Sequence, residues 1–93
     1  MKTFHDLGFF LYAHGITTKM LFDNGYGVSV VRTKHSKGGL EGKYEIAVLN
    51  SDYSICYDTP ITDDVIGWLS PEEVTDYMRQ IQELKPKNHE AEV

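Results

Sequence analysis

The sequence is poor in the residues that would mark a secreted or redox-active protein. Cys56 is the only cysteine among 93 residues, so no disulfide can close within the chain. A nucleophilic thiol needs a positioned base, and no histidine lies within ten residues of Cys56. We therefore expect Cys56 to be a small buried side chain.

Long apolar runs are also missing. A helix that spans a bilayer needs about 20 apolar residues, and the most apolar stretch, GFFLYAHGI, is far shorter. The N-terminal region contains Asp6 and lacks the small-residue cleavage site of a signal peptide. These absences predict a cytosolic protein with no membrane association.

Spacings that would identify a metal or nucleotide site are absent as well. The histidines match no metal-ligand pattern and are scattered along the chain: His5, His14, His35 and His89. The glycine-rich run SKGGLEGK lacks the second glycine of a phosphate-binding loop and precedes a predicted strand rather than a helix. We expect no cofactor.

The run FDNGYGVSVV predicts the turn of a β-hairpin. If Asp23–Gly25 is a three-residue loop with its glycine in the left-handed region, Met20 faces Val28 and Thr18 faces Val30. Because side chains alternate along a strand, this register gathers the apolar ones on one face. They are Met20, Phe22, Tyr26, Val28 and Val30.

A second hairpin is predicted from KYEIAVL and SICYD, which flank the turn residues NSDY. A loop centred on Ser51 and Asp52 places Val48 opposite Ile55. The same register places Ile46 opposite Tyr57, and a second apolar face results. A short turn capped by Thr62 or Asp63 is then expected before Trp68.

The run SPEEVTDYMRQIQELKP predicts a helix. Ser70 is the expected N-cap, Pro71 occupies the first helical position, and Glu73 completes a capping box. Lys85 and Pro86 end the helix. Apolar residues recur at helical spacing and predict a stripe that covers the sheet: Val74, Tyr77, Met78, Ile81 and Leu84.

These elements predict an α+β fold: an antiparallel sheet of about four strands, built from two hairpins, with one C-terminal helix across one face. The expected organisation is an apolar N-terminal arm (1–16), one domain (17–85) and a flexible tail (86–93). The arm is a short helix, an edge strand or a segment docked on another chain. The second face of the sheet is mixed, so either the arm covers it or a second chain does in a homodimer.

Charge is unevenly distributed and indicates where a partner would bind. Between Arg32 and Lys43 there are four cations and one acid, whereas Asp58–Leu84 contains seven acids and one arginine. We predict contacts through this basic loop and through an acidic surface, with Trp68 as an anchor unless it fills the corner between sheet and helix. The predicted partner-binding residues are Arg32, Lys34, His35, Lys37, Asp58, Asp63, Asp64, Trp68, Glu72 and Asp76.

Nucleic-acid binding is not expected, because the chain has a net charge of −5 and few cations in register. The converse hypothesis is that the acidic segment imitates the charge of DNA. Asp58, Asp63 and Asp64 could instead bind a cation in an irregular loop. The ordinary alternative for these acids is helix-end capping on a solvated surface.

The runs FDNGYGVSVV, GKYEIAVL and YDTPITDDVIGWLSPEEV resemble a group of small uncharacterised accessory proteins of tailed bacteriophages of enteric bacteria. The resemblance covers Met20–Leu84 and is most specific in Tyr57–Leu69. It implies a viral protein that acts in the host bacterial cytosol and brings no catalytic residues. By analogy, it implies a non-enzymatic protein that binds and inhibits or redirects a host protein, including a defence system.

Two alternatives to this function come from other classes. One is a small metal-dependent hydrolase that uses Asp58, Asp63 and Asp64. A pocket with convergent carboxylates would favour it. The other is a self-assembling structural component, which a large apolar self-interface would favour.

Overall fold

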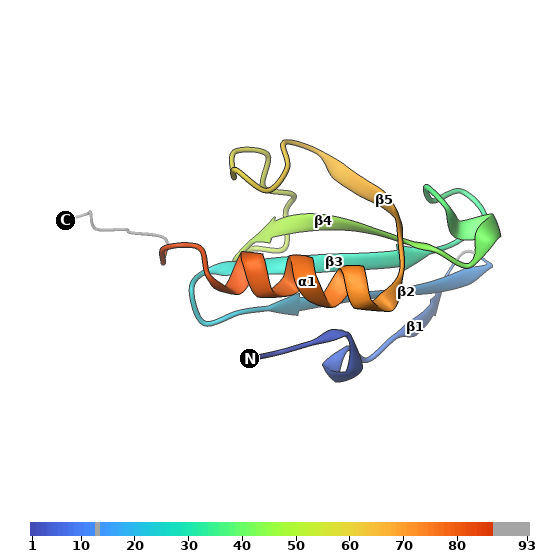
Figure 1. The fold of residues 1–93 in the computed structure, drawn as a ribbon, viewed down its shortest axis with the longest axis horizontal. Coiled ribbons are helices and arrows are strands. Elements are labelled where there is room, and N and C mark those ends of the chain that lie inside the picture. The colour runs from blue at the N-terminus through green and yellow to red at the C-terminus, as the bar shows by residue number, and fades with distance from the viewer. Residues whose placement is uncertain (13, 87–93) are drawn as a thin grey trace.

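One antiparallel sheet carries one long helix across a face (Figure 1). The computed structural model describes residues 1–12 and 14–86, so the predicted tail beyond Pro86, including His89, lies outside it. The strands are adjacent in chain order: β1 (Phe10–Tyr12), β2 (Gly15–Leu21), β3 (Tyr26–Arg32), β4 (Tyr44–Asn50) and β5 (Val65–Leu69). The predicted α+β class is confirmed, with five strands rather than about four.

The first hairpin has the predicted register. In the β2–β3 pair Met20 lies opposite Val28 and Thr18 opposite Val30. Gly25 has the left-handed φ of 87° that the three-residue turn requires. Val28 and Val30 are fully buried, so this hairpin supplies the centre of the core.

The predicted register of the second hairpin is wrong. Ile55 lies opposite Leu49, in an isolated bridge, instead of opposite Val48, and the residue paired with Ile46 is Ile66 of β5 rather than Tyr57. The turn contains Tyr53 at a left-handed φ of 71°, and this conformation sets a different register from the one that alternation predicts. The chain then leaves the sheet, and β5 pairs with β4 at the position where SICYD was predicted to pair.

The helix begins where the sequence predicts. Helix α1 (Pro71–Gln82) has Ser70 as its N-cap: the Ser70 hydroxyl accepts the Glu73 N–H at 3.2 Å, and the Glu73 carboxylate accepts the Ser70 N–H at 2.9 Å. Glu83 is the C-cap, so the helix ends slightly before the predicted Lys85. Its fully buried residues, Val74, Met78 and Ile81, belong to the predicted stripe.

The core lies between α1 and one face of the sheet. The helix contacts β3, β4 and β5 (Figure 1). Cys56 is 2% exposed, which confirms its prediction as a buried side chain. The buried cluster consists of Val28, Val30, Tyr44, Ile46, Val48, Cys56, Leu69, Val74, Met78 and Ile81. No helix in the described ranges has both the length and the apolar character needed to cross a membrane.

The N-terminal residues form a 3-10 turn, η1 (Phe4–Asp6), followed by the edge strand β1. The aromatic rings of Phe4 and Phe9 pack on Tyr44, with centroids 5.1 and 5.9 Å from its ring. The backbone N–H of Phe4 also donates to the Thr75 hydroxyl at 3.0 Å. The N-terminal turn therefore closes one end of the space between α1 and the sheet.

The face of the sheet away from α1 carries a short apolar row. Leu21 lies opposite Gly27, Gly27 opposite Leu49, and Leu49 opposite Ile55. The Leu21 side chain folds over Gly27, where a Cβ would lie 2.8 Å from Leu21 Cδ2. Leu49 is only 1% exposed, so this part of the second face is covered within the chain.

Candidate functional site

The loop between β3 and β4 is folded by its own hydrogen bonds. The carbonyl oxygen of Thr33 accepts the Ser36 N–H at 3.2 Å, and that of Gly38 accepts the Lys43 N–H at 2.9 Å. A second 3-10 turn, η2 (Gly39–Glu41), lies between Gly38 and Lys43. The glycine-rich composition thus produces a series of tight turns at the end of the sheet where β5 runs into α1 (Figure 1).

Lys37 ties this loop to the last two strands. Its backbone N–H donates to the Glu45 carboxylate of β4 at 2.8 Å, and its carbonyl oxygen accepts the Trp68 N–H of β5 at 3.1 Å. The Lys37 side chain also lies directly against Gly67, because a Cβ on Gly67 would overlap Lys37 Cβ. The loop and β5 are therefore held together through one residue.

Trp68 has an unusual backbone conformation for a strand. Its φ is 62°, in the left-handed region, at an irregularity where β4 and β5 shift register between Tyr44 and Ile46. A bulge of this kind changes the direction of a side chain, and a left-handed non-glycine residue is strained by about 1–2 kcal/mol. The Trp68 side chain is 59% exposed, so it is not the buried corner filler.

Gly38 lies beneath the indole. A Cβ on Gly38 would lie 3.0 Å from Trp68 Cα and 3.1 Å from Trp68 Cδ2, tighter than ordinary contact. Gly38 also has a left-handed φ of 87°. The absence of a side chain at this position allows the loop to pack against the ring.

We call the resulting surface the indole site. It is a shallow hollow of about 260 Å³. Leu40 is 83% exposed and adds a second apolar group beside Trp68, while Lys34 and Lys37 bring positive charge. The full lining is Lys34, Ser36, Lys37, Gly38, Leu40, Glu41 and Trp68. An apolar centre with a mostly cationic rim suits an apolar side chain flanked by acidic groups.

Three of the predicted partner-binding residues, Lys34, Lys37 and Trp68, come together in the indole site. Arg32 does not line it: its guanidinium donates to the Tyr44 hydroxyl at 3.2 Å and lies 5.2 Å from the centroid of that ring. His35 is exposed on the same loop, and its backbone N–H bonds to the Thr33 hydroxyl at 3.1 Å.

The predicted acidic residues before β5, Asp58, Asp63 and Asp64, have separate structural roles. Asp58 accepts a hydrogen bond from the Cys56 thiol at 2.9 Å. Asp63 and Asp64 are exposed in the irregular segment before β5, and the Asp64 N–H donates to the Thr62 hydroxyl. This turn at Thr62 precedes a strand that the sequence did not predict.

The two predicted acids of the helix are also separate from the indole site. Glu72 lines a hollow with the N-terminal turn that includes Phe4. Asp76 is 2.6 Å from Arg79, and this hydrogen-bonded guanidinium lowers the pKa of Asp76. Asp76 is therefore engaged within the helix.

Leu40 is the functional candidate that the sequence analysis missed. It is an apolar residue alone in a polar, glycine-rich loop, and that isolation was a usable signal. Within residues 1–12 and 14–86, no group of three or more histidine, cysteine, aspartate or glutamate side chains is placed to hold a metal ion. Comparisons of the chain with protein-family models, curated proteins and solved structures find no match.

Proposed function

We propose that this chain is a non-enzymatic binding module that docks on a host bacterial protein through the indole site and inhibits or redirects it. The observation that carries the proposal is Trp68: a large aromatic side chain, 59% exposed, on a left-handed backbone. Strain of this kind persists where the surrounding structure enforces it, and it clusters at ligand-binding sites. Here the Lys37 carbonyl and the register shift enforce it.

An exposed indole is well suited to anchor a protein interface. Tryptophan is among the residues whose truncation weakens complexes most, because it fills a desolvated pocket on the partner. Leu40 would enlarge the apolar contact, since it is 83% exposed beside the ring. In the free protein neither side chain is buried, so docking would remove both from water.

The charges around the indole define the partner further. Lys34 and Lys37 favour an acidic surface around the pocket that receives Trp68. Attraction between exposed charges is screened by salt, so association should slow as ionic strength rises. The resemblance of Tyr57–Leu69 to phage accessory proteins supports a host protein as the partner and the bacterial cytosol as the compartment.

The test uses tagged protein expressed in infected host cells, with three chains compared in parallel. Trp68→Gly removes the indole while the backbone keeps a residue that accepts a left-handed φ. Tyr57→Ala is the matched control, because Tyr57 is a similarly exposed aromatic residue (57%) that does not line the indole site. Proteins retained by the wild type and the control but lost from Trp68→Gly are the candidate partners.

The strongest candidate is then purified and its affinity is measured. We expect Trp68→Gly to weaken binding by about 30-fold or more, equivalent to a hot-spot loss of about 2 kcal/mol. Lys34→Glu with Lys37→Glu should reduce the association rate and its salt dependence. If Trp68→Gly retains the same host proteins as the wild type with equal affinity, the proposal is wrong.

A further inference from the structure

The two edges of the sheet are protected differently. The edge strand β5 has a register shift and donates its Trp68 N–H to Lys37, so the β3–β4 loop covers part of that edge. In β1, at the other edge, the described residues include no lysine, proline or register shift. Such devices prevent strands from pairing between molecules. β1 is short, at three residues, which also limits pairing, but its described residues carry no charge, proline or register shift.

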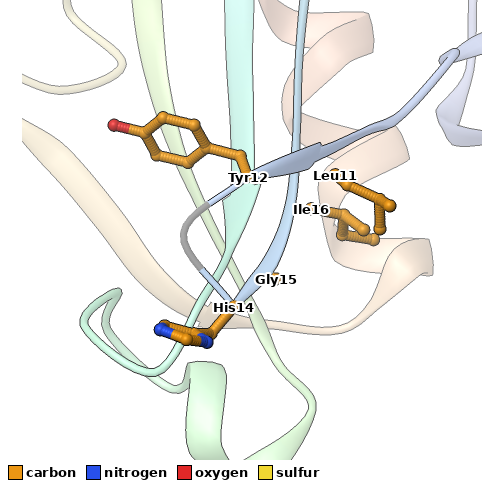
Figure 2. Close-up of a pocket in the computed structure, with 5 residues that line it drawn as sticks. All are labelled: Leu11, Tyr12, His14, Gly15 and Ile16. Atoms are coloured by element: carbon orange, nitrogen blue, oxygen red, sulfur yellow. The ribbon is translucent and has the colours of Figure 1, made fainter.

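The side chains of β1 are also exposed. Phe10 is 70% exposed, Leu11 92% and Tyr12 59%. Leu11 lies opposite Ile16 of β2, and Figure 2 shows their side chains together on one side of the hairpin while Tyr12 points away. A hollow of about 550 Å³ lies beside them. An exposed apolar edge strand of this kind is a template for another strand.

We propose that β1 pairs with β1 of a second copy of this chain, antiparallel and centred on Leu11, to form one continuous ten-stranded sheet. In this register Leu11 lies opposite the second copy's Leu11 on the face of the sheet that carries α1. Phe10 lies opposite the second copy's Tyr12 on the other face, twice by symmetry. The hollow beside Leu11 and Ile16 would receive the second copy's Leu11.

The partner strand is identified as a second β1 because β1 is complementary to itself in the antiparallel direction. Residues Leu7–Tyr12 carry no charge, so antiparallel self-pairing brings no like charges together in this segment. It also pairs aromatic with aromatic and leucine with leucine, which are favourable cross-strand neighbours. Because the loop occupies part of the β5 edge, a two-fold pairing that closes on itself is favoured over an open filament.

The area available sets the strength of the contact. The exposed parts of Phe10, Leu11 and Tyr12 in two copies amount to on the order of 800 Å². Stable interfaces bury about 1,200–2,000 Å² in total, so this dimer should be weak and dependent on concentration. We expect mostly monomer at about 10 μM and mostly dimer at about 1 mM, which corresponds to a dissociation constant on the order of 100 μM.

Sedimentation velocity across that range tests the proposal. Leu11→Lys places two ammonium groups opposite each other at the two-fold axis and should keep the chain monomeric. Leu40→Lys is the matched control: Leu40 is similarly exposed (83%) and lies in the indole site, so this variant should dimerise like the wild type. A wild type that stays monomeric at about 1 mM, or dimers of unchanged strength in Leu11→Lys, would overturn the proposal.

Oxidative cross-linking with copper–phenanthroline locates the contact. Opposed side chains at a two-fold axis have Cβ atoms about 5 Å apart, so Leu11→Cys should form a covalent dimer readily. Leu40→Cys has the same added thiol and should not, while Cys56 is buried in both variants. Equal cross-linking of the two variants would contradict the register. Trp68→Gly should dimerise normally, so failure here is distinguishable from failure of the proposed function.

Discussion

The side-chain amide of Asn24 donates a hydrogen bond to the carbonyl oxygen of Ile81, 57 residues later, at 2.8 Å. The same amide group reaches the Leu84 carbonyl at 3.2 Å, and its oxygen accepts the Tyr26 N–H at 3.2 Å. Carbonyl groups in the last turn of a helix lack the regular donor four residues later. Here the Ile81 oxygen accepts the Leu84 N–H at 3.2 Å in addition to the Asn24 amide. The Asn-Gly turn therefore shapes the first hairpin and also satisfies the C-terminal end of α1.

Removing this contact should destabilise the protein. We expect Asn24→Ala to lower the free energy of unfolding by about 1 kcal/mol, because the partly buried Ile81 and Leu84 carbonyl oxygens lose the Asn24 amide, while Ile81 keeps the Leu84 N–H. Asn24→Asp keeps the acceptor for Tyr26 but places a carboxylate against the negative end of the helix, so it should lose at least as much. Urea denaturation followed by circular dichroism measures both. The control, Asp23→Asn, changes the neighbouring exposed residue and should have little effect.

The capping box offers a second test of stability. Replacing Ser70 with alanine removes the hydroxyl that accepts the Glu73 N–H. Losses at N-caps are about 1 kcal/mol, and the midpoint of urea unfolding should fall accordingly. Ser70→Thr keeps an acceptor and should stay close to the wild type. Equal stability of Ser70→Ala and the wild type would show that this cap does not contribute.

Glu73 should make stability depend on pH. The hydrogen bond from the Ser70 N–H, with a smaller effect of the Ser70 hydroxyl, holds the pKa of Glu73 below its ordinary value of 4.5. Folding therefore favours the ionised carboxylate, and the resulting stabilisation is complete above the unfolded-state pKa. It is lost as the pH falls through the lower folded-state pKa.

The measurement is the thermal midpoint between pH 6 and pH 3 for Glu73→Gln and Glu72→Gln. The Glu73 variant should lose part of the acid dependence seen in the wild type, because glutamine does not titrate. Glu72→Gln removes an adjacent carboxylate that does not bond to the cap, so it controls for net charge. Parallel curves for the two variants would contradict the role assigned to Glu73.

Two glycines of the β3–β4 loop form a matched pair. Gly38 and Gly42 both have left-handed φ, 87° and 75°, so alanine strains the backbone similarly at each. A Cβ on Gly42 meets nothing within 4 Å, whereas one on Gly38 meets Lys43 and Trp68. Gly38→Ala should therefore destabilise the protein more than Gly42→Ala in urea denaturation, and it should weaken partner binding. Equal losses would mean that the indole does not press on Gly38.

Local chemistry explains what could be predicted from the sequence. The turn at Gly25 and the cap at Ser70 depend on residues within a few positions, and both are confirmed. The second register failed because a left-handed tyrosine, Tyr53, cannot be read from composition. Strand β5 was missed because its pairing with β4 depends on a partner about 20 residues away and on the bulge at Trp68.

In the candidate site, too, the individual residues could be predicted from the sequence, but their arrangement in space could not. Lys34, Lys37 and Trp68 were each predicted as contact residues from charge and residue type. Their meeting in one hollow depends on the Lys37 carbonyl accepting the Trp68 N–H across 31 positions, which no local pattern encodes. Arg32 was predicted as a contact residue from its charge alone. It instead packs on the Tyr44 ring of another strand, and no local pattern indicates that these two residues meet.

The position of the one tryptophan has a practical consequence for spectroscopy. Since the Trp68 ring is already in contact with water, its emission should lie to the red in the folded chain and shift little on denaturation. Soluble quenchers such as iodide should reach it freely. A blue shift with protection from iodide would then report occupancy of the indole directly, without any added label.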